Sequence, residues 1–290
     1  MRALIAALLV LAPLQAGCAR PAADAEPALW RIADEDSEIW LFGTAHMLRP
    51  ELKWRGPRLN AAFARAEELV TETDTSLEAA NQAQTLSAAL GTMPAGERLS
   101  DRLSADQRAR LARVLGTLRM DAAGLETMRP WLAALRISYA YALSRGMRPE
   151  AGVESVLGAE ARDRGMRMSF LETPEQQVRI LAELSPEEEL RFFDDTLREA
   201  ESDALDEIDT LWARGDTAAL ARIFDAQWES VSPTLHEAVI LRRNQAWADE
   251  IARKLQGEGR VFIAVGAAHL VGEGNVIALL RARGIAVEGP

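Results

Sequence analysis

The sequence predicts an α/β fold in which a small central β-sheet is built from two strand–Gly-x-x-His–helix–strand halves, with a large helical insertion between them. One observation is a repeat: two hydrophobic, β-prone runs near opposite ends of the chain each end in Gly-x-x-His, at Gly43–His46 and Gly266–His269. The other is that residues 76–165 are alanine-rich and mainly helical in their spacing. A chain of 290 residues is long enough for one such domain.

The first half opens with a predicted β-hairpin. Trp30–Ile32 and Glu38–Phe42 are β-prone runs on either side of a polar turn. After a loop with two prolines, residues 58–68 place apolar side chains at helical spacing. Residues 69–72 then form a short apolar run that ends in Glu72, which predicts a buried strand with a carboxylate at its end.

Two further β-prone runs lie later in the chain. Residues 166–172 precede Thr173-Pro174-Glu175-Gln176, which has the cap, first-turn proline and capping glutamine of a helix N-terminus. A strand should therefore pass directly into a helix after Glu172. Residues 260–265 form the clearest strand, and a helix near 275–283 with a strand over 285–288 completes the second half.

Long helices are expected between these strands. An acidic helical stretch begins at Ser185 and runs to about Arg214. Ser232-Pro233 begins a helix that carries Arg243 and Asn244. We therefore expect residues 29–290 to form a single α/β domain with a helical insertion over about 76–258.

The first 19 residues have the features of a signal peptide. Met1-Arg2 precedes a twelve-residue apolar run, which is shorter than the roughly 20 residues of a membrane span. The residues around Cys18 resemble a lipoprotein cleavage site, where the cysteine is lipidated and anchors the protein to a bacterial membrane. Ordinary signal-peptidase cleavage near Ala19 or Ala23 is the alternative. Residues 20–28 are expected to be a flexible tether, and either cleavage places the mature protein in the periplasm or outside the cell.

Composition excludes several classes of protein and site. The net charge of −11 and a pI of about 5.0 argue against a nucleic-acid partner, which requires clustered positive charge. A single cysteine forms no intrachain disulfide and no cysteine-rich metal site. Any site that uses imidazole must draw on three histidines, His46, His236 and His269.

The paired Gly-x-x-His motifs are the best candidates for a functional site. Glycine at the end of a strand allows a sharp turn or a close approach of the backbone to another group. His46 and His269 then leave the sheet at its carboxyl edge, where α/β proteins bind ligands, and they meet if their strands are neighbours. The alternative is two loop histidines with structural hydrogen bonds. His236 lacks this setting and is expected to be structural.

From about Trp30 to Gly284 the sequence resembles the TraB/GumN family, which includes the PrgY and Tiki proteins. The segments that carry the resemblance are Leu41–His46, Val70–Glu72, Leu171–Thr173 with Gln177, Arg243-Asn244 with Trp247, and Val265–Leu270 with Gly272. The resemblance implies an α/β domain with a large helical insertion and an active site at the paired motifs. Tiki proteins are metal-dependent proteases, so a peptidase-like hydrolase is the implied activity.

The resemblance assigns roles residue by residue. His46, His269 and Glu72 would hold a divalent metal ion, with Glu72 either the third ligand or the general base. Arg243 would stabilise an oxyanion or anchor a substrate carboxylate, and its alternative is a structural ion pair. We assign Glu172, Gln177 and Asn244 to substrate binding; for Glu172 the alternative is charge compensation at a helix N-terminus.

Two other functions are compatible with the same residues. In a metal-independent hydrolase, one histidine acts as general base on water and Glu72 orients it. In a non-catalytic periplasmic binding or accessory protein of the GumN type, the same site residues bind a peptide or small molecule without turnover. Activity that survives chelation would favour the metal-independent hydrolase over the metal enzyme. Absence of both bound metal and turnover would favour the binding protein.

Overall fold

The computed structural model describes residues 25–230 and 232–290. The expected signal peptide, Cys18 and residues 20–24 of the expected tether lie outside these described residues. Residues 25–28 pack against the body of the protein: Pro27 is buried, and the Glu26 amide donates a 2.8 Å hydrogen bond to the carbonyl of Ala213.

Five strands form one mixed sheet, which confirms the predicted α/β fold with a large helical part. Its order is β1-β2-β5-β3-β4; β1 is antiparallel to β2, and the other four strands are parallel. The strands are β1 Leu29–Ala33, β2 Ser37–Thr44, β3 Glu68–Thr71, β4 Arg167–Phe170 and β5 Gly259–Gly266. All eight residues of β2 are buried, as expected of a strand that is covered on both faces.

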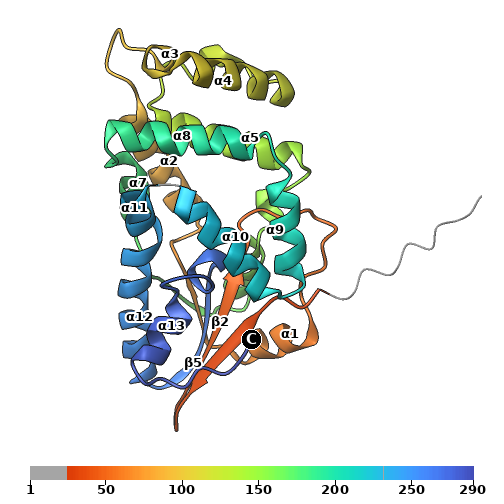
Figure 1. Cartoon of the computed structure of the whole chain (residues 1–290). Helices are drawn as coiled ribbons and strands as arrows, with labels where there is room; N and C mark the ends of the chain where they lie inside the picture. Colours follow the sequence, from red (N-terminus) through yellow and green to blue (C-terminus); the bar gives the residue numbers. More distant parts are fainter. Residues whose placement is uncertain (1–24, 231) are drawn as a thin grey trace, which may run out of the picture.

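Helices flank the sheet and extend beyond one end of it (Figure 1). In that view α1 lies on one side of the sheet, and α12 with α13 lies on the other. The helices are α1 Pro57–Arg65, α2 Leu77–Gly91, α3 Leu99–Arg102, α4 Ala105–Leu118, α5 Pro130–Ser144, α6 Val153–Asp163, α7 Pro174–Ala182, α8 Pro186–Glu199, α9 Ala204–Ala213, α10 Thr217–Ser230, α11 Pro233–His236, α12 Arg242–Leu255 and α13 Val276–Ala282. A π-helical turn, Glu237–Leu241, joins α11 to α12, and a 3₁₀ turn, Ala267–His269, follows β5.

The structure has two apolar cores. The larger core surrounds the sheet, where Phe63 of α1 packs edge-on against Phe262 of β5 with ring centroids 5.1 Å apart. The smaller core lies among α3, α4, α5 and α8, where Phe193 and Leu197 of α8 are fully buried. Figure 1 shows α3 and α4 above α5 and α8, so α8 separates this second core from the space above the sheet.

The acidic stretch that was predicted as continuous helix is two helices, α8 and α9, with a turn over residues 200–203. Partners on α5 fix this turn: the Tyr141 hydroxyl donates to the Ser202 carbonyl, and Arg145 pairs with Asp203 at 3.0 Å. Because these partners lie some 60 positions earlier in the chain, helical periodicity alone does not reveal the break.

The strand predicted over residues 285–288 is not formed. Glu288 instead makes a single antiparallel bridge to Arg31 on the outer edge of β1, and its side chain is 69% exposed. A short β-prone run favours extended backbone but does not specify a partner strand. Only the first half of the repeat therefore brings a carboxylate, Glu72, to the histidines.

No helix within the described ranges is both long and apolar enough to cross a membrane.

Candidate functional site

The carboxyl ends of β2, β5 and β3 bring the predicted histidines and glutamate together. Thr44 of β2 is opposite Gly266 of β5, so the two Gly-x-x-His motifs leave the sheet side by side. A Cβ atom built on Gly266 would lie 3.0 Å from Glu72 Oε1, 3.6 Å from His269 Cδ2 and 3.8 Å from His46 Nε2. All three predicted groups therefore surround one point, and the absence of a side chain at Gly266 leaves that point open.

His46 is held by a carboxylate from a distant helix. Its Nδ1–H donates a 2.7 Å hydrogen bond to Glu154 Oε1, which also accepts from the Thr44 hydroxyl. The His46 side chain is 68% exposed, whereas Glu154 is buried. The negative charge of the adjacent Glu154 raises the pKa of His46 above its usual value. With Nδ1 engaged, Nε2 is the ring atom that faces the point beside Gly266.

The start of α6 lies beside His46 because backbone hydrogen bonds join the loop after β2 to the loop before α6. The Val153 amide donates to the Ala45 carbonyl at 3.1 Å, and Leu48 and Arg148 exchange backbone hydrogen bonds of 3.3 and 2.8 Å. A Cβ at Gly152 would lie 2.0 Å from the His46 carbonyl oxygen, so only glycine permits this contact.

His269 is buried and its hydrogen bonds fix its tautomer. Asn244 Nδ2 donates to the Gly274 carbonyl at 2.9 Å, which leaves Asn244 Oδ1 to accept from His269 Nδ1–H at 2.7 Å. Nε2 is then the unprotonated nitrogen, consistent with its 3.1 Å contact to Arg243 Nη1, which can only donate. Burial lowers the pKa of His269 to about 3 and Arg243 adds to this effect, so the ring is neutral.

Glu72 is a buried carboxylate with four polar neighbours. Its Oε1 accepts from the Gly266 amide at 2.7 Å and lies 4.0 Å from His269 Nε2. Its Oε2 accepts from Arg243 Nη2 at 2.6 Å and from Gln177 Nε2 at 3.2 Å. Burial would raise the pKa of Glu72, but the positive charges of His46 and Arg243 and the Gly266 amide outweigh it and lower the pKa to about 2.

Arg243 uses all five of its N–H groups within the protein. Besides Glu72 and His269, it donates to both oxygens of Glu172, at 2.7 and 2.9 Å, and to the Val239 carbonyl at 3.0 Å. The π-helical turn before α12 contains Val239, and such turns occur frequently at functional sites. In this arrangement Arg243 has no N–H group left to donate to an oxyanion. It makes ion pairs with Glu72 and Glu172, which is the alternative role considered for it.

The remaining predicted residues also converge here, but their contacts are to the protein. Glu172 is occupied by Arg243 and also accepts from Trp247 Nε1 at 3.2 Å. Asn244 is completely buried and positions His269. Gln177 alone of these three lines the open cavity described below.

Glu154 is the functional residue that sequence reasoning missed. It lies in the first turn of α6, where an acidic residue is ordinarily explained by the helix dipole. The nearby Gly152 is the one local signal of a close contact, and it does not identify His46 as the neighbour. One oxygen of Glu154, Oε2, is buried without a partner among the described residues.

The donor set fits a divalent metal ion in chemical type. His46 and His269 each engage Nδ1 with an oxygen acceptor, as metal-binding histidines usually do, and His269 Nε2 accepts from Arg243 Nη1 at 3.1 Å in this structure. Glu72 Oε1 supplies a carboxylate oxygen beside them. Within the described residues no three histidine, cysteine, aspartate or glutamate side chains stand close enough to be a ready metal-binding group. Arg243 donates to His269 Nε2 at 3.1 Å and to Glu72 Oε2 at 2.6 Å.

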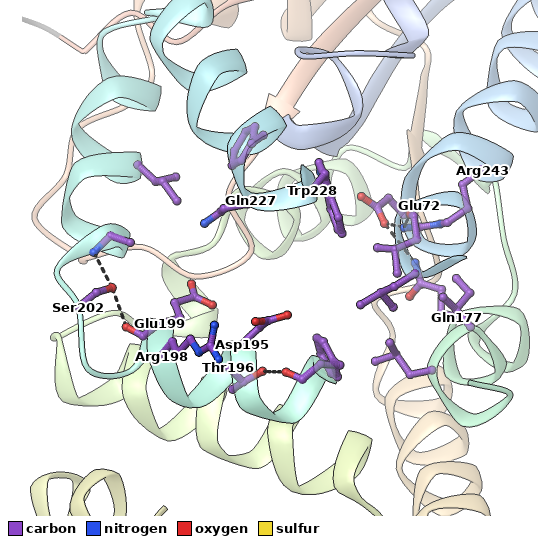
Figure 2. A pocket seen from close by; sticks show the side chains of 18 residues that line it. Glu72, Gln177, Asp195, Thr196, Arg198, Glu199, Ser202, Gln227, Trp228 and Arg243 are labelled. Carbon is purple, nitrogen blue, oxygen red and sulfur yellow. Dashed lines mark hydrogen bonds and ion pairs between the residues drawn. The ribbon is translucent and has the colours of Figure 1, made fainter. Parts of the chain in front are cut away.

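A large cavity opens from this site toward the helical part. It has a volume of about 840 Å³ and is lined mainly by apolar side chains of α7, α8, α9, α10 and the α11–α12 junction. Glu72, Gln177 and Arg243 lie at one end of it, and Asp195 and Glu199 of α8 lie along another wall (Figure 2). Glu72, Gln177 and Arg243 therefore connect the site to a half-open, mainly apolar cavity, whereas His46 does not line it.

The fold and site define a class: an α/β protein in which two Gly-x-x-His histidines and a buried glutamate meet at the carboxyl edge of the sheet. The model of the TraB/PrgY/gumN family matches residues 28–289, and the chain belongs to this family, which confirms the resemblance. The chain is 28% identical over 247 residues to the uncharacterized protein YbaP of Escherichia coli (strain K12) and to YbaP of Shigella flexneri; each alignment covers 83% of this chain and 87% of the relative. No solved structure matches the chain.

Proposed function

We propose that this protein is a metal-dependent hydrolase of the peptidase type, with His46, Glu72 and His269 as the residues that hold the metal. The observation that carries the proposal is the convergence of two histidines and one carboxylate around Gly266, next to a cavity of about 840 Å³. A divalent ion bound there would supply Lewis acidity to the hydrolysis of a carbonyl compound.

The surrounding residues favour one of the two roles considered for Glu72. A carboxylate with a pKa of about 2 is a weak proton acceptor, so Glu72 suits a ligand better than a general base. Arg243 keeps Glu72 ionised and is itself anchored by Glu172 and Val239. A ligand on His269 Nε2 would displace the Arg243 Nη1–H that donates to it at 3.1 Å.

The metal-independent hydrolase remains a second candidate because of one contact. An exposed histidine whose Nδ1–H is held by a buried carboxylate, as His46 is by Glu154, has the geometry of a general acid–base group. In that mechanism His46 Nε2 exchanges the proton and Glu72 orients water or substrate. The two candidates differ in their need for a metal, not in their residues.

The test is metal content and turnover measured on the same preparations. Protein purified without chelators is analysed for bound metals and assayed with quenched-fluorescence peptides, before and after dialysis against a chelator. We expect stoichiometric metal, and loss of both metal and turnover in His46→Ala and in His269→Ala. His236→Ala is the matched control, because His236 stacks on Trp228 outside the converging groups.

Two results would overturn the proposal in different ways. Full turnover after metal removal, still dependent on His46, favours the metal-independent hydrolase. Binding of peptides without turnover in any metal favours the non-catalytic accessory protein.

We also propose that the protein is exported, with residues 1–19 as its signal peptide. The support is the composition of this segment alone. Mass spectrometry of the mature N-terminus distinguishes lipidation at Cys18 from cleavage near Ala19 or Ala23, and an unprocessed Met1 in cells with active secretion would contradict export.

A further inference from the structure

The cavity above the site carries an unbalanced charge. Four aromatic or aliphatic side chains, Ile180, Leu181, Phe192 and Phe224, form much of its wall. Asp195 and Glu199 lie one helical turn apart on α8 and both line the cavity, as Figure 2 shows. Within the described part of the chain, neither carboxylate has an ion-pair partner.

The other charged groups that line the cavity are already paired. Arg198 donates to Asp194 at 2.6 Å, and Asp194 also pairs with Arg110 at 2.7 Å. Arg243 and Glu72 neutralise each other at 2.6 Å, with Glu172 as a second anion. Asp195 and Glu199, both on α8, are therefore the carboxylates of the described cavity wall that have no ion-pair partner.

Partial burial makes the ionised form of the Asp195 and Glu199 carboxylates energetically unfavourable. Burial raises the pKa of Glu199. Burial also raises the pKa of Asp195, with Asp194 adding to the effect and Arg198 and Arg191 opposing it. Carboxylates that are partly desolvated and without a counterion gain most from a cation that enters the same space.

We propose that this cavity binds a substrate group that combines an apolar body with one positive charge, an ammonium or guanidinium, which Asp195 and Glu199 bind. The apolar wall takes the hydrocarbon part, and Trp228 presents an aromatic ring of the kind that attracts cations. The inference deepens the proposed hydrolase, on which it rests for turnover, by assigning the substrate class: peptides with a cationic group near the bond that reaches Glu72.

The cation can come from two places in a peptide. One is the free α-amino group of a chain that begins with an apolar residue, and the other is a lysine or arginine side chain within the chain. The chemistry at Asp195 and Glu199 is the same in both cases. Phe-Ala-Ala-amide and acetyl-Ala-Arg-Ala-amide represent these two sources.

The test measures binding calorimetrically, so that it does not depend on turnover. The probes are 4-phenylbutylamine and its neutral analogue 4-phenylbutanol, which share a shape and differ in charge. We expect the amine to bind about tenfold more tightly than the alcohol. In the double variant Asp195→Asn/Glu199→Gln, the ratio should fall to about one while the affinity for the alcohol is kept.

Glu187→Gln is the control, because Glu187 is an exposed residue on the same helix and its substitution removes one of the two negative charges that the double variant removes. It should leave the ratio unchanged. Equal affinities for amine and alcohol, no measurable binding of the amine, or a preference that persists in the double variant would overturn the inference. The two peptides then show which source the wild-type cavity prefers.

The same experiment separates this inference from the proposed hydrolase. His46→Ala should abolish turnover but keep the amine preference, because His46 does not line the cavity. If the wild-type protein prefers the amine over the alcohol but shows no turnover, the cation-binding cavity is supported and the proposed hydrolase is not. If it shows turnover without this preference, the hydrolase is supported and the cation-binding cavity is not.

Discussion

His269 donates a hydrogen bond from Nδ1 to Oδ1 of Asn244 at 2.7 Å, and Asn244 is completely buried. The bond leaves Nε2 of His269 as the nitrogen that faces Glu72, 4.0 Å away. The resemblance led us to assign Asn244 to substrate binding, and in the structure its side chain contacts His269 and Gly274. Its role in this structure is to select the tautomer of a neighbouring histidine.

Asn244→Ala should lower the free energy of unfolding by about 2–4 kcal/mol, because it leaves the buried His269 Nδ1–H and the Gly274 carbonyl without partners. Urea unfolding at neutral pH measures this loss. Asn81→Ala on the exposed side of α2 is the control and should change stability by less than about 0.5 kcal/mol. A comparably small effect at Asn244 would show that the hydrogen bonds are not formed.

Glu154→Gln should lower the pKa of His46, because it removes the charge that raises that pKa and keeps a hydrogen-bond acceptor. The stabilisation from this pair is present below the pKa of a free histidine, about 6.5. It is lost as the pH rises through the higher pKa of folded His46. Titration of the His46 ring by NMR measures the shift. Glu160→Gln on the same helix, which removes a carboxylate that pairs with Arg55, should not move it.

If the proposed hydrolysis takes place at this site, Gly266→Ala should reduce it about 100-fold or more while the protein stays folded. The backbone of Gly266, at φ −49° and ψ 136°, is open to alanine. The added methyl group would lie 3.0 Å from Glu72 Oε1 and 3.8 Å from His46 Nε2, at the point where the predicted groups converge. Activity and circular dichroism on the same sample measure the two effects.

Gly116→Ala provides the comparison, because nothing lies within 4 Å of a Cβ at this helical position. It should raise stability by about 1 kcal/mol without changing activity. Wild-type activity in Gly266→Ala would place the reaction elsewhere in the molecule.

Local patterns were sufficient to predict the framework of the site. A strand that ends in Gly-x-x-His reaches the carboxyl edge by its own geometry, so His46 and His269 could be placed before their surroundings were known. Glu72 followed from the same rule, since it directly follows β3. The predicted helix start at Thr173 is confirmed by reciprocal hydrogen bonds between Thr173 and Gln176.

Long-range partners could not be predicted in the same way. Glu154 lies 108 positions from His46, and its identity as a partner depends on how α6 docks against the loop after β2. The cavity likewise needs α8 and α10 to face each other, which no periodicity specifies. The bridge between Glu288 and β1 could not be predicted for the same reason, because the sequence of an extended segment does not specify which strand it pairs with.

Arg243→Leu should destabilise the protein by about 3–5 kcal/mol, because it leaves the buried carboxylates of Glu72 and Glu172 without their counterion. Combining it with Glu172→Gln should cost less than the sum of the two single changes, since one of the stranded charges is then absent. Denaturant unfolding of the four proteins in this cycle measures the coupling. Additive effects would mean that the two side chains do not form an ion pair in solution.

Asp195→Asn and Glu199→Gln should each raise the free energy of unfolding, because each removes an unpaired carboxylate whose pKa burial raises. An acid whose pKa is raised by folding holds its proton more tightly in the native state, so the native protein gains stability as the pH falls through that pKa. The difference in free energy of unfolding between each variant and the wild type should therefore be largest at pH 8 and decrease as the pH falls. Urea unfolding across this pH range measures it, with Glu187→Gln as the exposed control. Variants that are less stable than the wild type at pH 8 would show that these carboxylates are already satisfied, and the cavity would then have no charge to offer a cation.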